Sequence, residues 1–236
     1  MSVPSSRVWA VVPAAGSGTR MQSAVPKQYL PLAGQSVLDR TLGVLLASAA
    51  FHGVVVVLAT DDEYWQTSSL ADEPRITTAT GAALRCESVR NGLAHLSEFA
   101  DAQDWVAVHD AARPCVTQQD LRSVLAAALA HVDGALLAVP VADTLKSADA
   151  GGCVTETISR EHLWRALTPQ VFPLQRLRTA LDAALADGRQ PTDEAQAMEW
   201  AGYRPRLVPG STGNLKITCP HDLQLAEALL TRAGVG

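Results

Sequence analysis

Short, continuous apolar runs recur along the chain at residues 8–12, 54–59, 106–109 and 135–139. Strands that are buried on both faces of a parallel sheet have this pattern, because neither face of such a strand meets water. A further stretch of β type lies at residues 75–79. The pattern therefore predicts a sheet of mostly parallel strands.

Helices are predicted between these strands. One of them, at residues 121–131, follows Thr117 and Asp120, which form a capping box with Asp in place of Glu. Another, at residues 174–186, is followed by Gly188 at a position typical of a helix C-cap. Since strands and helices alternate, we predict an α/β fold that binds its ligands in the loops at the carboxyl ends of the strands.

A polar segment interrupts this alternation. Two stretches of β type, at residues 143–147 and 154–158, flank a turn signal at residues 150–152. A hairpin alone is marginally stable in water, so it must pack on something, and a second copy of the chain would serve. We expect one domain over residues 1–236, with residues 142–170 as a protruding β-arm.

Composition narrows the possible partners. The chain has 236 residues, of which 47% are hydrophobic and 18% charged, and this is typical of an ordered protein with one main core. Its formal net charge of -5 gives no general attraction to polyanions, so we do not expect nucleic acid as a partner. The four cysteines lack metal-ligand spacing, and no apolar run approaches the roughly 20 residues that span a bilayer. We expect a cytoplasmic protein with free thiols and no membrane partner.

A loop of small residues follows the first predicted strand, from Pro13 to Met21. Its backbone N–H groups can approach phosphate oxygens closely, although a glycine-rich turn can also simply join a strand to a helix. The loop is not a Walker A motif, and Met21 occupies the third glycine position of a dinucleotide fingerprint. Because Arg20 and then Lys27 add two cations, the sequence favours a triphosphate ligand.

Three later positions have the chemistry of the same site. Ser88, within residues 81–89, can bind a ligand or cap the helix that follows. Asp110 follows a buried strand and can hold Mg²⁺ or a ribose hydroxyl, or form a simple Asx turn. Lys216 falls in a predicted short strand at residues 213–218, where a buried ammonium group needs an anionic partner.

Seven blocks of the sequence, in order, resemble the methylerythritol phosphate cytidylyltransferases of the non-mevalonate isoprenoid pathway. The blocks are residues 13–21 with 26–29, then 81–89, 109–114, 140–144, 163–170, 192–195 and 214–218. This resemblance implies a single Rossmann-like nucleotidyltransferase domain with a mostly parallel sheet and a β-hairpin arm that is exchanged within a homodimer. It also implies CTP and 2-C-methyl-D-erythritol 4-phosphate as substrates, with Mg²⁺ as cofactor.

The resemblance implies roles for individual residues as well. The residues that would hold CTP are Ala14, Ala15, Gly16, Gly18, Gly81, Ser88, Asp110 and Ala111, and Asp110 would also meet the metal. The catalytic cations would be Arg20, Lys27 and Lys216. The residues that would bind the sugar phosphate are Arg113, Thr144, Thr168 and Thr192, with Arg160 reaching in from the arm of the second subunit.

The expected reaction needs no general base. A phosphate oxygen of the acceptor attacks the α-phosphorus of CTP, and this oxygen is already ionised near pH 7. The barrier lies in bringing two anions together, so catalysis should consist of positioning and charge stabilisation.

Three other functions stay open at this point. A ribitol 5-phosphate cytidylyltransferase would share the same loops and the arm. A nicotinamide-dependent oxidoreductase is disfavoured by Met21 in the loop. A non-catalytic nucleotide-binding protein would keep the loop but would not need Lys216.

Overall fold

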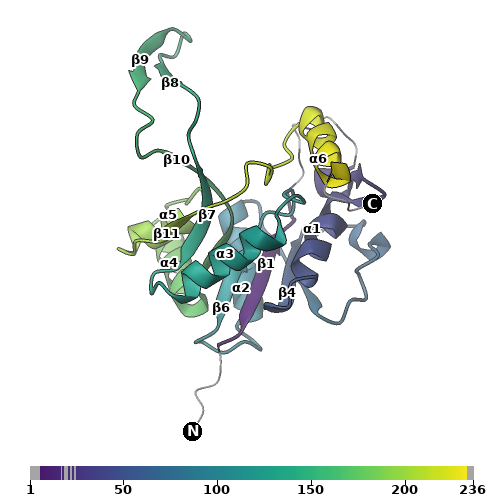
Figure 1. Cartoon of the computed structure of the whole chain (residues 1–236). Coiled ribbons are helices and arrows are strands. Elements are labelled where there is room, and N and C mark those ends of the chain that lie inside the picture. Colours follow the sequence, from purple (N-terminus) through teal and green to yellow (C-terminus); the bar gives the residue numbers. More distant parts are fainter. Residues whose placement is uncertain (1–5, 17, 19–20, 22, 24, 233–236) are drawn as a thin grey trace.

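The computed structural model of the chain describes residues 6–16, 18, 21, 23 and 25–232. Its centre is a seven-stranded sheet with the strand order β11-β7-β10-β6-β1-β4-β5 (Figure 1). The strands of this sheet are β1 (Val8–Pro13), β4 (Phe51–Leu58), β5 (Ile76–Thr80), β6 (Trp105–Val108), β7 (Ala135–Pro140), β10 (Trp164–Pro173) and β11 (Arg206–Pro209). All neighbouring strands are parallel except β10, which runs antiparallel to both β6 and β7. The predicted α/β fold with a mostly parallel sheet is confirmed.

Helices cover both faces of the sheet. One face carries α1 (Val37–Leu46) and α3 (Gln118–Leu129), and the other carries α2 (Arg85–Leu96), α4 (Leu174–Ala186) and α5 (Glu194–Trp200). A last helix, α6 (Pro220–Arg232), packs near the small hairpin of β2 (Pro31–Leu32) and β3 (Gln35–Ser36). Within the described residues, no helix is long and apolar enough to cross a membrane.

The strand β1 shows why the apolar runs predicted the sheet. Its residues Ala10 and Val12 lie in the core beneath α1 and α3, whereas Trp9 and Val11 lie in the core beneath α2 and α4. Successive side chains of a strand point to opposite faces, so a strand covered on both faces has to be apolar throughout. The same reasoning applies to β4, β6 and β7, which are buried along nearly their whole length.

The predicted helix signals are also confirmed. The side chain of Thr117 accepts a hydrogen bond from the backbone N–H of Asp120, and the Asp120 carboxylate accepts one from Thr117 N–H. This reciprocal pair starts α3 one turn earlier than its apolar pattern alone indicates. At the other helix, α4 ends at Ala186, and Gly188 takes the left-handed conformation with a φ of 70°.

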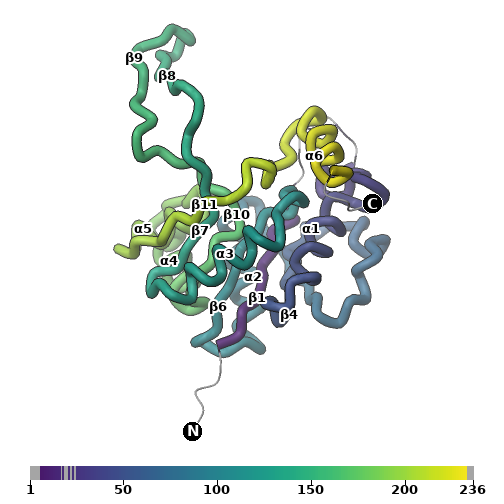
Figure 2. The backbone as a smooth tube through the Cα atoms, in the orientation of Figure 1, coloured from purple at the N-terminus to yellow at the C-terminus, as the bar shows by residue number. Residues whose placement is uncertain are grey.

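A two-stranded hairpin of β8 (Leu145–Ala148) and β9 (Val154–Ile158) projects from the sheet as the predicted arm (Figures 1 and 2). These two strands pair with each other and not with the central sheet. From Trp164 onward, by contrast, the chain pairs with β7 as part of β10. Residues 164–170 of the predicted segment at 142–170 therefore belong to the sheet, and only the hairpin and its two connections project.

Residues 210–219, which we call the strap, join β11 to α6 (Figure 2). The prediction of a short strand at 213–218 is wrong, because these described residues form no ladder with any neighbour. The strap is instead held by single contacts, such as the backbone hydrogen bond of 2.8 Å from Ile217 N–H to the carbonyl of Ala112. It crosses the carboxyl end of β6, where ligand-binding loops are expected.

The close approach of α2 to the sheet gives a test of the fold. A methyl group on Gly92 would lie 2.6 Å from Cγ2 of Val57 and 2.8 Å from Cγ1 of Val11. We expect Gly92→Ala to lower the free energy of unfolding by about 1–3 kcal/mol, measured by urea denaturation. The matched control is Gly43→Ala in α1, where no described heavy atom lies within 4 Å of the added methyl group. It should be neutral or raise stability by about 0.5–1 kcal/mol, and equal losses in both variants would contradict the packing argument.

Candidate active site

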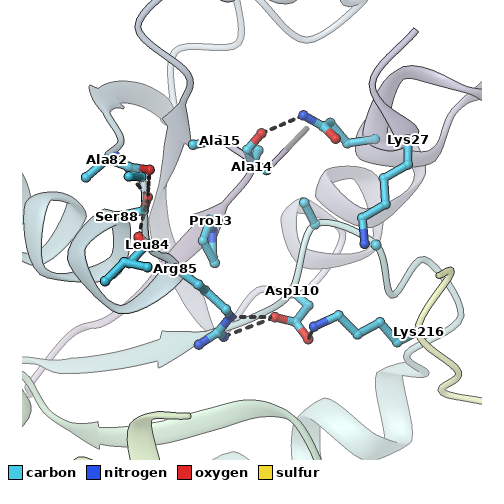
Figure 3. A pocket seen from close by; sticks show the side chains of 15 residues that line it. Pro13, Ala14, Ala15, Lys27, Ala82, Leu84, Arg85, Ser88, Asp110 and Lys216 are labelled. Carbon is cyan, nitrogen blue, oxygen red and sulfur yellow. Dashed lines mark hydrogen bonds and ion pairs between the residues drawn. The ribbon is translucent and has the colours of Figure 1, made fainter. Parts of the chain in front are cut away.

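Loops from three parallel strands meet at the carboxyl end of the sheet and enclose a pocket (Figure 3). The loop after β1 forms one wall, the loop after β5 and the start of α2 form another, and the loop after β6 forms the floor. The lining residues are Pro13, Ala14, Ala15, Gly16, Lys27, Gln28, Ala82, Ala83, Leu84, Arg85, Ser88, Asp110, Ala111, Ala112 and Lys216. We call this hollow the first pocket.

The two loop walls of the first pocket lie close together because of their small residues. A methyl group on Gly81 would lie only 2.5 Å from Cβ of Ala15, so a glycine is needed for this approach. Behind the first wall, the buried side chain of Gln28 donates a 2.6 Å hydrogen bond to the carbonyl of Ala14. This hydrogen bond fixes the backbone of the loop after β1 at the rim of the pocket.

Ser88 shapes the second wall and does not cap the helix. The N-cap of α2 is Leu84, which excludes the alternative that Ser88 caps this helix. The Ser88 hydroxyl accepts a 3.0 Å hydrogen bond from Ala82 N–H and lies 3.1 Å from the carbonyl of Leu84, to which it can donate. These contacts curl the loop at residues 82–84 over the start of the helix.

Two predicted catalytic lysines, which are 189 positions apart, line the same pocket. Lys27 lies in the short 3-10 helix η2 (Lys27–Tyr29), and its Nζ donates to the carbonyl of Ile217 in the strap at 3.2 Å. Gly18 makes room for this side chain, since a methyl group there would lie 2.9 Å from Cγ of Lys27. Arg20, the third predicted cation, lies outside the described residues.

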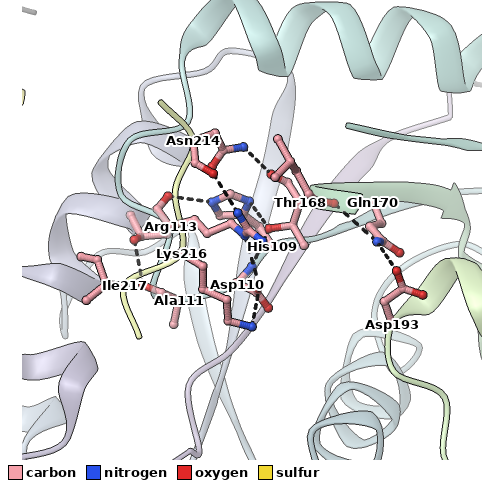
Figure 4. Close-up of polar contacts among 12 residues, drawn as sticks. His109, Asp110, Ala111, Arg113, Thr168, Gln170, Asp193, Asn214, Lys216 and Ile217 are labelled. Carbon is pink, nitrogen blue, oxygen red and sulfur yellow. Dashed lines mark hydrogen bonds and ion pairs between the residues drawn. The ribbon is translucent and has the colours of Figure 1, made fainter. Parts of the chain in front are cut away.

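Asp110 joins three cations at the floor of the pocket (Figures 3 and 4). Its Oδ1 lies 3.0 Å from Nη2 of Arg85, and its Oδ2 lies 3.0 Å from Nζ of Lys216 and 3.3 Å from Nε of Arg113. Arg85 is shared with Glu194, whose Oε1 lies 2.6 Å from Nη1 of Arg85. The lining of the first pocket thus carries Lys27, Arg85 and Lys216 against one carboxylate, which makes it positive in an acidic chain.

The charge states follow from these contacts. Burial alone would raise the pKa of the Asp110 carboxyl, but Arg85, Lys216 and Arg113 hold this pKa well below its usual range. Burial alone would lower the pKa of Arg85, but the carboxylates of Glu194 and Asp110 raise it above its ordinary value. The carboxylate and the guanidinium therefore stay charged at neutral pH.

We call Asp110, Arg85, Arg113 and Lys216 together the Asp110 cluster. A second pocket opens on the other side of this cluster. Its lining residues are Arg85, Asp110, Arg113, Ala166, Leu167, Thr168, Gln170, Thr192, Asp193 and Lys216. It shares Arg85, Asp110 and Lys216 with the first pocket, so these charged groups form the boundary between the two hollows. Two ligands bound in the two pockets would meet at this boundary.

The structure brings most predicted substrate-binding residues to the second pocket. Arg113, Thr168 and Thr192 line it, the first two largely buried and Thr192 exposed. Thr144 and Arg160 lie on the arm instead, are exposed, and line neither pocket among the residues that the structure describes. Arg160 donates to the carbonyl of Ala142 at the base of its own arm.

The surroundings of Asp110 bear on the predicted magnesium site. Both of its carboxylate oxygens are in contact with guanidinium or ammonium groups. Within the described part of the chain, no group of three or more His, Cys, Asp or Glu side chains gathers that could hold a metal ion through side chains alone. These residues do not fit a metal ion that the protein holds by itself.

Arg85 and Glu194 were not predicted as site residues. An arginine at the start of a helix is usually solvated, and a glutamate at the start of another helix is typical of a surface. One signal was available for Arg85, namely its position in the loop at 81–89 of an acidic chain. For Glu194, which is 1% exposed, no local signal in the sequence indicates burial beside a guanidinium.

Comparison with known proteins identifies the family. The family model described as IspD: 2-C-methyl-D-erythritol 4-phosphate cytidylyltransferase matches residues 8–232. The chain belongs to this family. The predicted resemblance and the nucleotidyltransferase fold are both confirmed.

Relatives of this cytidylyltransferase family match the chain over nearly its full length. The 2-C-methyl-D-erythritol 4-phosphate cytidylyltransferase of Tolumonas auensis is 51% identical over 221 residues, which cover 94% of this chain and 95% of that relative. The protein of the same name from Pseudomonas aeruginosa is 52% identical over 216 residues, covering 91% and 92% of the two chains. The crystal structure of the Francisella tularensis protein (IspD) superimposes with a TM-score of 0.84 at 33% identity, covering 95% of this chain and 100% of that chain.

The Asp110 cluster should govern stability in acid. Asp110→Asn has nearly the same shape but leaves three cations without their shared counter-charge, so we expect the free energy of unfolding to fall by about 3 kcal/mol. Because the pKa of Asp110 is lower in the folded state, its stabilising effect is complete above the unfolded pKa of about 3.9 and is lost as the pH falls further.

The measurement for this variant is thermal unfolding from pH 8 to pH 3. The gap in melting temperature between wild type and Asp110→Asn should be constant near neutral pH and shrink below about pH 4. Asp182→Asn is the control, because Asp182 is exposed and its nearest cation, Arg178, is 3.9 Å away. Its effect should stay below about 1 kcal/mol, and a similar loss in both variants would refute the special role of Asp110.

Proposed function

We infer that this chain transfers a cytidylyl group from CTP to 2-C-methyl-D-erythritol 4-phosphate and releases pyrophosphate, as a step of isoprenoid precursor biosynthesis. Membership in the family supports the reaction. The observation that carries the site assignment is the pair of adjoining pockets with cations at their shared boundary. A reaction between two phosphorylated molecules requires such a boundary.

CTP is proposed to occupy the first pocket. Its phosphates would lie against the backbone N–H groups of Ala14, Ala15, Gly16 and Gly18, with Arg20 and Lys27 as the neutralising cations. The cytidine would lie between Gly81, Ser88, Asp110 and Ala111. The small residues that line both walls support this placement, because they leave the backbone groups of the walls accessible to a ligand.

The acceptor phosphate is proposed to occupy the second pocket. Arg113, Thr168 and Thr192 line it, and Lys216 lies at the boundary, where the α-phosphorus of CTP would meet the attacking oxygen. This oxygen forms the new P–O bond while the bond to the β-phosphate breaks and pyrophosphate carries away the electron pair. The protein contributes orientation and positive charge, and no proton has to be removed from the nucleophile.

Magnesium is proposed to enter with the nucleotide. The oxygens of Asp110 are engaged by three cations, whereas a triphosphate offers several hard oxygen ligands of its own. Mg²⁺ supplies further charge neutralisation on the phosphates when it is bound in this way.

The cytoplasm stays the predicted location from the sequence alone.

The arm is proposed to be exchanged between two subunits of a homodimer. It carries Val154 and Leu163, which are 63% and 37% exposed, and Trp164, at the start of the adjoining strand β10, is 36% exposed. A hairpin with such surfaces is expected to pack on a partner. Arg160 and Thr144, which lie on this arm, would then approach the second pocket of the other subunit. This arrangement accounts for two expected substrate-binding residues that lie away from the site in one chain.

A pyrophosphate-release assay tests the function directly. CTP, UTP and ATP are each combined with methylerythritol phosphate and with ribitol 5-phosphate. We expect turnover with CTP and methylerythritol phosphate at the highest kcat/KM. Preference for ribitol 5-phosphate would replace the proposed acceptor, and binding of CTP without any turnover would favour a non-catalytic protein.

The two lysines of the first pocket should be essential for turnover. We expect Lys27→Ala and Lys216→Ala each to lower kcat by about a hundredfold or more, because each removes one charge that stabilises the transition state. Arg122→Ala is the control, since Arg122 is exposed on α3 and its side chain contacts Gln119. Near wild-type kcat in both lysine variants would exclude the proposed site.

Mixing two inactive variants tests the shared site. Lys27→Ala removes a residue of the body, and Arg160→Ala removes a residue of the arm, so one site of each mixed dimer keeps both residues. We expect mixed dimers to regain about a quarter to a half of the wild-type kcat, in line with closed two-fold assembly. Subunit exchange is verified by tagging one variant, and exchange without recovered activity would show that each site uses its own arm.

A further inference from the structure

Four buried residues beside the Asp110 cluster form a closed ring of hydrogen bonds (Figure 4). His109 lies 3.0 Å from Oγ1 of Thr168 through Nδ1 and 3.1 Å from the carbonyl of Arg113 through Nε2. Asn214 closes the ring with two hydrogen bonds. Its side-chain amide donates to the backbone carbonyl of Thr168 at 2.8 Å, and its backbone carbonyl accepts from Nη1 of Arg113 at 2.8 Å. The ring joins the end of β6, the strand β10 and the strap. All four residues are 9% exposed or less.

The direction of each hydrogen bond in this ring can be deduced. A carbonyl oxygen can only accept, so Nε2 of His109 carries the proton that reaches Arg113. The ring is completely buried, and its two nitrogens contact a carbonyl and a hydroxyl rather than a carboxylate, so the imidazole is neutral and its Nδ1 has no proton. Therefore Nδ1 accepts, and the hydroxyl of Thr168 donates its only proton to it.

The Thr168 hydroxyl then has a fixed orientation. Its oxygen also accepts a 3.0 Å hydrogen bond from the backbone N–H of Asp110. With its proton directed at His109, Thr168 has no hydrogen to donate to a bound phosphate. Its side chain instead fixes the backbone of Asp110, the residue that joins the three cations at the pocket boundary.

We propose that His109 is a positioning residue, which acts through the Thr168 hydroxyl and the Arg113 carbonyl to hold Asp110 and Lys216 at the boundary between the two pockets. This role rests on the proposed function, because the boundary is where the two substrates react. Asp110 is adjacent to His109 in the chain, and its backbone N–H is hydrogen-bonded to the hydroxyl of Thr168. Lys216 follows Asn214 by two residues. The two partners of the 3.0 Å Asp110–Lys216 ion pair are thus both attached to the ring.

The hydrogen-bond roles are tested first, without substrates. In ¹⁵N NMR spectra of protein labelled at histidine, His109 should show a protonated Nε2 and an unprotonated Nδ1 near pH 7. His109→Asn identifies its signals by their loss. In Thr168→Val the Nδ1 signal should shift, because the hydroxyl that donates to it is gone. A proton on Nδ1, or an Nδ1 signal that ignores Thr168→Val, would overturn the proposal whether or not the chain has the proposed activity.

Kinetics then test the positioning role. Thr168→Val has the same shape but no hydroxyl, so we expect kcat to fall by up to about a hundredfold, the scale of a small misplacement of reacting groups. The KM for CTP should change by less than about threefold, because CTP lies in the other pocket. Thr168→Ser restores the hydroxyl and should recover at least about tenfold in kcat over Thr168→Val. An unchanged kcat with a raised KM for the acceptor would mean that Thr168 binds the acceptor directly, and it would overturn the proposal.

A double-mutant cycle separates positioning from general damage. His109→Phe alone should lower kcat about as much as Thr168→Val, and the double variant should lose little more than either single one. His109→Asn keeps an acceptor near the position of Nδ1, so it should retain more kcat than His109→Phe even if both lower the melting temperature. Losses that multiply in the double variant, or an equal kcat in the Asn and Phe variants, would show that the two residues act separately.

Discussion

The carboxylate of Asp110 is the group on which the site depends. Three cations that come from the start of α2, the loop after β6 and the strap lie within 3.3 Å of its oxygens. Like charges this close repel strongly in a partly buried setting. Without the carboxylate, this repulsion would push apart the three segments that carry the cations. Asp110 keeps these cations ordered before any phosphate arrives, and an ordered set of charges need not be reorganised during the reaction.

The two pockets divide the chemistry between different kinds of residues. The first has walls of alanine and glycine, so its contacts to a ligand come largely from backbone groups and from the ends of lysine and arginine side chains. The second has polar and charged side chains such as Thr192, Asp193 and Gln170. Backbone N–H groups suit phosphates of any nucleotide, whereas side chains at defined positions can distinguish one acceptor from another. We therefore expect selectivity for the acceptor to lie in the second pocket.

Local patterns in the sequence predicted the sheet, the capping box of α3 and the loop that follows β1, because each is determined by neighbouring residues. The remaining features depend on contacts between distant residues, which no local pattern reports. Arg85 meets Glu194 from 109 positions away, and Arg113 meets Asn214 from 101 positions away. Residues 213–218 of the strap were predicted as a strand because their apolar and β-branched residues have that pattern, yet no strand among the described residues pairs with them.

The charge balance of the second pocket explains why one chain alone is expected to provide only part of the acceptor site. A phosphate monoester brings close to two negative charges at neutral pH. Arg113 is already bonded to Asp110 and to the carbonyl of Asn214, and Lys216 and Arg85 are held at the boundary by Asp110. Each of these cations is thus partly neutralised before the acceptor binds. Arg160 is a further arginine, to which the family resemblance gives a role in binding the acceptor, and it lies on an arm that projects from its own body (Figure 1). An arm donated by a second subunit would supply the missing charge, and this is the physical reason to expect a shared site.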